Sequence, residues 1–294
     1  MKPSPFDYKK VLTLSEALEA FDEKDQRDLR LLAGGQSLVP MMNLRLARPE
    51  VLIDLNQIEQ LDYINDEGGV IEVGAITRLR SLETDEQVSF FIPLLQEAVG
   101  LVAHAAVRAR GTVGGNIAHA DPSAEIPTAL VALEANIVAS SASGERDIPA
   151  KDFFLGAFFT SLEEREIVTS VKIPKSIGQT GSAFVEFAPR HGDFAIVGVA
   201  AIISIDDSGK CTSVRIVLSG VDGRPLDVSS AAEPLIGNQE ISQELFEAVG
   251  QSIFERVDPG SDIHASAEFR RELCQMLSVD ALNKAWERLG GSNG

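Results

Sequence analysis

The chain has 294 residues, of which 44% are hydrophobic and 24% charged, a balance typical of a globular protein long enough to bury a substantial core. Its formal net charge of −18 excludes the basic surface that non-specific binding to DNA or RNA requires. A nucleotide cofactor would therefore have to be held by backbone N–H groups rather than by a positive field.

The start of the chain carries no recognisable targeting signal. The opening MKPSPFDYKK lacks an apolar h-region and a small-residue cleavage site, and no run of about 18 apolar residues occurs later in the sequence. We therefore expect no signal peptide and no membrane span, and we expect the protein in the cytoplasm.

The first third of the chain is predicted to mix short helices with short strands. Ser15 is typical of a helix N-cap, and Ala17, Leu18 and Phe21 then recur on one face of the helix that it would open. Short apolar runs predict three strands, LRLLAG at 29–34, VLIDL at 51–55 and GVIEVGAIT at 69–77.

The middle third is predicted to contain more helix. Apolar spacing predicts helices over 78–83 and 92–104, and strand patterns at 134–139 and 144–148 predict a hairpin. EIVTSVKIP at 166–174 predicts a strand that stops at its proline. Because the next residues are typical of a linker, we place a boundary near 176–181, between a domain over 1–176 (subdomains of about 1–57 and 58–176) and a domain over 177–294.

The last third is predicted to be an antiparallel sheet followed by helices. Strand patterns cover 182–187, 194–206 and 211–221, with a hairpin turn at 206–209. Helical patterns follow over 231–237, 242–257 and 266–290. Strands followed by helices indicate an α+β module whose antiparallel sheet is covered on one side.

Two glycine-containing segments support the functional prediction. In LLAGGQSLVP at 31–40, a buried strand ends in Gly34 and Gly35. Glycine permits positive φ and close backbone approach, so successive N–H groups can converge into an anion-binding nest, to which Ser37 adds a hydroxyl donor.

The second segment, RGTVGGNIAHADPSAE at 110–125, follows the same logic. Gly111, Gly114 and Gly115 permit a tight loop, and Thr112 and Asn116 add polar side chains. Two nests on separate elements could grip one diphosphate from both sides, which fits a dinucleotide better than a single phosphate. Neither segment has Rossmann or P-loop spacing, and a glycine pair after a strand is more often only a turn, so spacing by itself leaves both readings open.

No catalytic or metal-binding constellation is visible in the sequence. The four histidines have no metal-ligand spacing, and no GxSxG nucleophile elbow is present. The two cysteines, Cys211 and Cys274, are too few for an iron–sulfur cluster, which takes about four thiolates. We therefore predict no catalytic residue and no metal ligand on this chain, and we place any cluster on another chain.

The order of these segments resembles a known family. AGGQSL at 33–38, followed by TVGGN at 112–116, resembles the paired FAD motifs in the medium subunit of molybdenum hydroxylases of the xanthine dehydrogenase and aerobic carbon monoxide dehydrogenase type. Three further stretches look like the same family, so that the resemblance covers nearly the whole chain: LARPEVLIDLNQI at 46–58, HADPSAEIPTALVAL at 119–133 and HGDFAIVGVAA at 191–201.

The resemblance implies a fold and a cofactor. The N-terminal part would be an FAD-binding domain of the PCMH or vanillyl-alcohol-oxidase type in two subdomains, and the remainder a carbon monoxide dehydrogenase flavoprotein C-terminal domain, both α+β. FAD would be bound non-covalently.

The resemblance also implies which residues contact FAD. The glycine segments would wrap its diphosphate, largely through backbone N–H groups. An acidic residue nine positions after the TVGGN asparagine would contact the cofactor, a hydrophobic residue would pack near the flavin or adenine, and an aromatic residue would lie near the isoalloxazine. These positions hold Leu32, Ala33, Gly34, Gly35, Gln36, Ser37, Leu38, Thr112, Val113, Gly114, Gly115, Asn116, Glu125, Val168 and Phe184, and we add His119 because it lies in the second segment.

One residue departs from the family pattern. Family members often carry a lysine near the cofactor in the strand that opens the C-terminal domain, and Glu186 stands at that position here. A carboxylate where a cation is usual would change the electronics of the flavin, because nearby charge tunes a cofactor.

The resemblance implies an electron-transfer role within a heterotrimer. Its partners would be a large subunit with a molybdenum cofactor and a small subunit with two [2Fe–2S] clusters, in a dimer of heterotrimers, and the flavin would pass electrons to an external acceptor. Two alternatives stay open: a self-contained FAD-dependent oxidoreductase, and a non-catalytic assembly subunit whose glycines form only turns.

Overall fold

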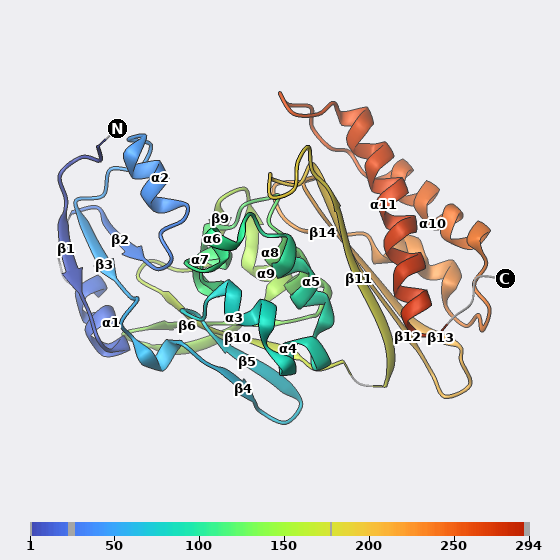
Figure 1. Ribbon diagram of the computed structural model, residues 1–294, viewed down its shortest axis with the longest axis horizontal. Coiled ribbons are helices and arrows are strands. Elements are labelled where there is room, and N and C mark those ends of the chain that lie inside the picture. The colour runs from blue at the N-terminus through green and yellow to red at the C-terminus, as the bar shows by residue number, and fades with distance from the viewer. Residues whose placement is uncertain (1, 23–26, 177, 291–294) are drawn as a thin grey trace.

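The computed structural model describes residues 2–22, 27–176 and 178–290. Figure 1 shows three sheets that follow one another from the N-terminal to the C-terminal part of the molecule. In the part of the chain that the structure describes, no helix combines the length and apolar surface needed to cross a bilayer.

The N-terminal sheet is parallel, in the order β1-β3-β2. Its elements are β1 (Asp7–Lys10), α1 (Leu14–Asp22), β2 (Leu29–Leu32), α2 (Leu38–Asn43) and β3 (Val51–Asp54). The sequence predicted β2 and β3 but not β1, whose residues are all exposed and so lack an apolar alternation.

Helix α1 begins one residue before the predicted cap. Thr13 Oγ1 accepts a hydrogen bond from Glu16 N (3.1 Å), as an N-cap side chain does. The hydroxyl of Ser15 instead donates to Glu19 (3.2 Å) within the helix. The prediction that Ser15 caps this helix is therefore wrong.

The central sheet is antiparallel, in the order β4-β5-β10-β6-β7. Its strands are β4 (Ile64–Asp66), β5 (Val70–Gly74), β6 (Asn136–Ser141), β7 (Gly144–Pro149) and β10 (Ile167–Pro174). The 3₁₀ helix η1 (Glu59–Leu61) leads into it, and β8 (Phe154–Gly156) pairs separately with β9 (Phe159–Thr160).

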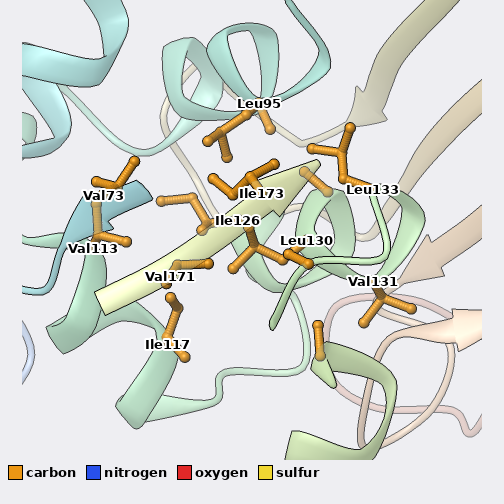
Figure 2. Packing of buried hydrophobic residues seen from close by; sticks show 14 of the residues in the cluster. Val73, Leu95, Val113, Ile117, Ile126, Leu130, Val131, Leu133, Val171 and Ile173 are labelled. Atoms are coloured by element: carbon orange, nitrogen blue, oxygen red, sulfur yellow. The ribbon is translucent and has the colours of Figure 1, made fainter. Parts of the chain in front are cut away.

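Seven short helices accompany the central sheet: α3 (Leu79–Thr84), α4 (Glu86–Phe91), α5 (Pro93–Leu101), α6 (Ala105–Arg108), α7 (Val113–His119), α8 (Glu125–Ala132) and α9 (Ala150–Phe153). Figure 2 shows Leu95, Ile126 and Leu130 of these helices packed over Val171 and Ile173 of β10. All five side chains are buried, so this contact is the centre of the central core.

The C-terminal sheet is antiparallel, in the order β11-β12-β13-β14. Its strands are β11 (Gln179–Phe187), β12 (Val197–Ile205), β13 (Cys211–Ser219) and β14 (Leu226–Asp227), followed by the 3₁₀ helix η2 (Ser229–Leu235), α10 (Gln243–Arg256) and α11 (Ala267–Arg288). Figure 1 shows α10 and α11 against the outer face of this sheet.

The prediction that this sheet is covered on one side is wrong. Phe184, Ala200 and Val217 belong to the central core cluster together with Ile126 and Leu130 of α8, so the inner face of the sheet packs on the central helices. The strand β12 has the sequence VGVAAIISI, with apolar residues at successive positions, which is typical of a strand buried on both faces.

Helix α11 supplies a test of the local structure. The Ser266 hydroxyl accepts a hydrogen bond from Phe269 N (3.2 Å) at the start of this 22-residue helix. We expect Ser266→Ala to lower the free energy of unfolding by about 1 kcal/mol, measured by thermal denaturation. Ser242→Ala is the matched control because Ser242 occupies the N-cap of α10 without a side-chain cap bond. If both variants lost the same free energy of unfolding, the cap bond of Ser266 would not stabilise α11.

Candidate cofactor site

The structure brings the two glycine segments into contact. A β-carbon added at Gly34 would lie 2.4 Å from the carbonyl oxygen of Arg110 and 2.7 Å from the α-carbon of Gly111. A β-carbon at Gly115 would lie 3.4 Å from that of Ala33. The first of these approaches is open only to glycine, because a real β-carbon does not come within 3 Å of such atoms.

Two polar side chains link the segments. Asn56 Nδ2 donates to the carbonyl oxygen of Ala33 (2.7 Å), and its Oδ1 accepts from Arg78 Nη2 (2.7 Å). The guanidinium of Arg78 also donates to the carbonyl oxygen of Arg110. Asn56 and Arg78 thus connect the first segment to the second.

Asp54 holds this linkage in place. It accepts a hydrogen bond from the amide of Asn56 (2.9 Å) and a short one from the hydroxyl of Tyr8. Burial opposes its ionisation, but the hydrogen bonds from Tyr8 and Asn56 outweigh burial and lower the pKa of the Asp54 carboxyl. Sequence reasoning missed these residues, although Asp54 ends β3, the strand that pairs with β2, and Asn56 follows it two residues later.

The first segment presents free main-chain donors. Among the described residues, the amides of Gly34, Gly35, Gln36 and Ser37 donate to no backbone or side-chain acceptor. Gly35 has φ +71°, a left-handed conformation that turns the chain after β2. Ser37 precedes α2 without a side-chain cap bond, so its hydroxyl is also available. These four free amides, called the nest below, are available to an anionic ligand.

The second segment differs from its prediction. It is the first turn of α7 rather than a loop, with Thr112 as the N-cap. The amides of Val113 and Gly114 donate to the carbonyl oxygens of Thr77 (3.1 Å) and Ala75 (2.8 Å), and that of Gly115 donates to Thr112 Oγ1 (3.2 Å). The expectation that these three amides are free to bind phosphate is wrong, because packing of α7 on the segment after β5 uses the first two and the N-cap side chain of Thr112 uses the third.

Two polar groups of the second segment remain open. The amide of Thr112 donates to no group in the described residues, and Thr112 is 2% exposed. The side-chain oxygen Oδ1 of Asn116 is buried and likewise has no partner in that part of the chain. Since buried polar groups are nearly always hydrogen-bonded, these atoms point to a ligand at this place.

The other residues predicted to contact the cofactor lie on four elements. His119 ends α7, with its ring centroid 5.1 Å from that of Phe158. Val168 is buried in β10 within the central core. Leu32 ends β2 and Leu38 begins α2, so these two residues flank the nest.

Two of the residues predicted to lie near the cofactor are acidic, and both are largely buried. Glu125 is the first residue of α8 and is 7% exposed. Burial, with smaller contributions from Glu186 and Asp121, raises its pKa to about 8. Burial also raises the pKa of Glu186, two residues after Phe184 in β11, to about 7.

The arrangement suits a diphosphate-bearing ligand. The nest offers four free amides, and the second segment adds one buried amide. The glycine contact holds the two segments together, so main-chain donors can bind an anion although the chain provides no positive electrostatic field. The described residues contain no cluster of three or more metal-ligating side chains. These features fit FAD, the cofactor expected from the sequence.

Family models match both parts of the chain. Residues 4–176 match the FAD binding domain in molybdopterin dehydrogenase. Residues 182–285 match the CO dehydrogenase flavoprotein C-terminal domain.

Individual proteins match over nearly the full length. The chain is 37% identical to the alpha subunit of the 6-hydroxypseudooxynicotine dehydrogenase complex of Paenarthrobacter nicotinovorans, over 98% of this chain and 97% of that one. Among solved structures, carbon monoxide dehydrogenase of Hydrogenophaga pseudoflava gives a TM-score of 0.93 at 35% identity, covering 98% of this chain and 99% of that one. Quinoline 2-oxidoreductase of Pseudomonas putida 86 gives 0.92 at 35% identity, covering 98% and 100%.

Proposed function

This chain belongs to the FAD-binding, medium-subunit family of the molybdopterin dehydrogenases, and we propose that it carries electrons through FAD between partner subunits and an external acceptor. It is an FAD-binding oxidoreductase component of α+β fold, with a flavoprotein C-terminal domain after the FAD-binding domain. Relatives of similar length are named as chains or subunits of multi-subunit dehydrogenases.

The observation that carries the proposal is the nest beside the second glycine segment. Gly34 to Ser37 would hold the FAD diphosphate through their free amides, and the amide of Thr112 and the Asn116 side chain would complete the grip from the opposite side. When bound, the flavin accepts and releases electrons, while the protein binds and orients it.

The cysteines of the chain are not placed to bind an iron–sulfur cluster. Cys211 and Cys274 are both buried in the C-terminal core, where burial raises the pKa of their thiols to about 11 and about 12, so neither is a ready metal ligand. We therefore infer that iron–sulfur clusters lie on a small partner subunit and the molybdenum cofactor on a large one, in a dimer of heterotrimers.

The two parts of the chain would contact different parts of the cofactor. We propose that residues 1–176 bind the diphosphate and that residues 177–294 bring Phe184 and Glu186 to the flavin side of the site. Both residues face the central helices from β11, since Phe184 belongs to the central core cluster.

The visible absorption spectrum tests the proposal. We expect the purified chain, either as isolated or after addition of FAD and removal of the unbound cofactor, to show flavin bands, and we expect the substrate of the complex to bleach them only when the molybdenum and iron–sulfur subunits are present. Bleaching by a small substrate without partners would favour a self-contained oxidoreductase. Absence of flavin bands after FAD addition would favour an assembly subunit.

A further inference from the structure

A buried arginine near the start of α11 joins two strand ends of the C-terminal sheet. Arg270 is 7% exposed, and its Nη1 donates to the carbonyl oxygens of Ile196 and Gly220, each at 2.7 Å. Ile196 directly precedes β12, and Gly220 directly follows β13, the neighbouring strand. Because hydrogen bonds from a charged guanidinium are stronger than those between neutral groups, Arg270 fixes these two strand ends against each other.

Glycine is required at position 220 for this contact. Gly220 has φ +75°, and a β-carbon added to it would come closer than 3 Å to the carbonyl oxygen of Ile196, the same oxygen that Arg270 binds. A side chain at this position would push that oxygen away from the guanidinium. The missing β-carbon therefore lets both carbonyl oxygens converge on one nitrogen of Arg270.

The backbone of Gly220 also contacts the FAD-binding part of the chain. Its amide donates to the carbonyl oxygen of Pro122 (2.9 Å), which lies in residues 120–124, called the α7–α8 turn below. In the same turn, the amide of Ala120 donates to the carbonyl oxygen of Asn116 (3.4 Å), whose side chain belongs to the candidate cofactor site. The contacts thus run from Arg270 through Gly220 and the α7–α8 turn to Asn116.

The α7–α8 turn needs such support because its backbone is strained. Ala120 has φ +50°, a left-handed conformation that a residue with a side chain keeps only when surrounding contacts hold it. Its carbonyl oxygen accepts a hydrogen bond from the amide of Phe158 (2.8 Å) in the β8–β9 hairpin, and Gly220 holds the turn through Pro122. Loss of the second support should let the turn relax and shift the end of α7.

Asp262 binds the same guanidinium through a different nitrogen. Its Oδ2 accepts from Arg270 Nη2 (2.7 Å), and its Oδ1 accepts from the amides of His264 (2.8 Å) and Ala265 (2.9 Å). The ion pair therefore holds the segment before α11 and uses neither of the bonds to Ile196 and Gly220. Because the two sets of bonds use separate nitrogens, their effects can be measured separately.

We propose that Arg270 is a positioning residue for the cofactor site: through Gly220 it holds the α7–α8 turn, and thereby Asn116, in the place from which α7 meets the nest. FAD binding by residues 1–176 then depends on a side chain of the C-terminal helix. Arg270 acts through the backbone and makes no contact with the cofactor. This inference rests on the proposed function, because FAD is the ligand whose affinity it changes.

FAD affinity of three variants tests the proposal. Arg270→Lys keeps the charge beside Asp262 but offers one nitrogen in place of the two that the native contacts use. We expect it to bind FAD about fivefold more weakly, the order by which coupling through intervening residues changes affinity. Asp262→Asn keeps both carbonyl bonds, and Arg271→Gln removes only a surface pair with Asp258, so both should bind FAD as wild type does. Titration of the apoprotein well below its melting temperature provides the measurement.

A double-mutant cycle separates positioning from a general loss of stability. If Arg270 acts through Asn116, the variant that combines Arg270→Lys with Asn116→Ala should bind FAD no more weakly than Asn116→Ala alone. A merely structural defect would add its full loss of affinity to that of Asn116→Ala. Additive losses, or a loss in Asp262→Asn equal to that in Arg270→Lys, would overturn the proposal.

Hydrogen exchange in the wild-type protein tests the same linkage without a substitution. Coupling between two places is reciprocal, so bound FAD should slow exchange of the Gly220 amide by about fivefold. The amide of Gly209, which donates to the carbonyl oxygen of Asp206 (2.9 Å) at the opposite end of β12 and β13, should exchange equally fast with and without FAD. Unchanged exchange at Gly220 would contradict the coupling, whereas failure of wild type to bind FAD at all would overturn the proposed function instead.

Discussion

Replacing Gly34 by alanine is expected to abolish FAD retention. The new β-carbon would lie 2.4 Å from the carbonyl oxygen of Arg110 and 2.7 Å from the α-carbon of Gly111, both backbone atoms that no side-chain rotation can move. The two segments would have to separate, which disrupts both the nest and its linkage through Asn56. We expect at least about a hundredfold weaker FAD binding, equivalent to about 2.7 kcal/mol, measured by titration of the apoprotein.

Two comparison variants make this result specific. Gly100→Ala adds a β-carbon with no atom within 4 Å and should retain wild-type flavin content. Gly35→Ala meets only two side-chain atoms at 3.2 Å but must keep φ +71°, so we expect an intermediate loss. Full flavin content in a folded Gly34→Ala protein would show that contact between the segments is not needed for binding.

Replacing Asn56 by alanine is expected to have the second largest effect. The substitution removes the bond to the carbonyl oxygen of Ala33 and leaves the guanidinium of Arg78 with the carbonyl oxygen of Arg110 as its remaining acceptor. Because Asn56 and Arg78 are half-buried, the loss of these two hydrogen bonds should cost the lower end of the range for an unpaired polar group, and we expect the free energy of unfolding to fall by about 1 kcal/mol. FAD affinity should fall about tenfold, since the nest then loses its tie to the second segment.

An exposed asparagine provides the control for this variant. Asn65 lies in the edge strand β4 with an exposed side chain, and Asn65→Ala should change neither quantity. Denaturant unfolding and FAD titration of the two variants give the comparison. If Asn56→Ala unfolds earlier but binds FAD as wild type does, the linkage stabilises the fold without shaping the site.

Both predictions assume that backbone amides, rather than charged side chains, bind the cofactor. The chain has a net charge of −18, so long-range attraction does not draw an anionic cofactor toward it. Free amides held at fixed positions replace that attraction, and they act only if the segments that carry them stay in register. Residues such as Asn56 and Arg78, remote from any expected redox chemistry, then matter as much as the glycines.

The sequence by itself determined the cofactor class and much of the secondary structure. The strands β2, β3 and β10 and the hairpin of β6 and β7 were predicted because each has its own apolar pattern and turn residues. The paired glycine segments identified the family, and the comparisons confirm that identification.

Only the tertiary structure decided how these parts cooperate. The sequence left the Thr112 to Asn116 segment as a glycine loop, whereas the structure makes it the first turn of α7, in which the amides of Val113, Gly114 and Gly115 are already hydrogen-bonded. It placed helices on one face of the C-terminal sheet, whereas α8 covers the other. Periodicity and turn residues act within a segment, but contacts between distant segments depend on which faces meet, and no local pattern contains that information.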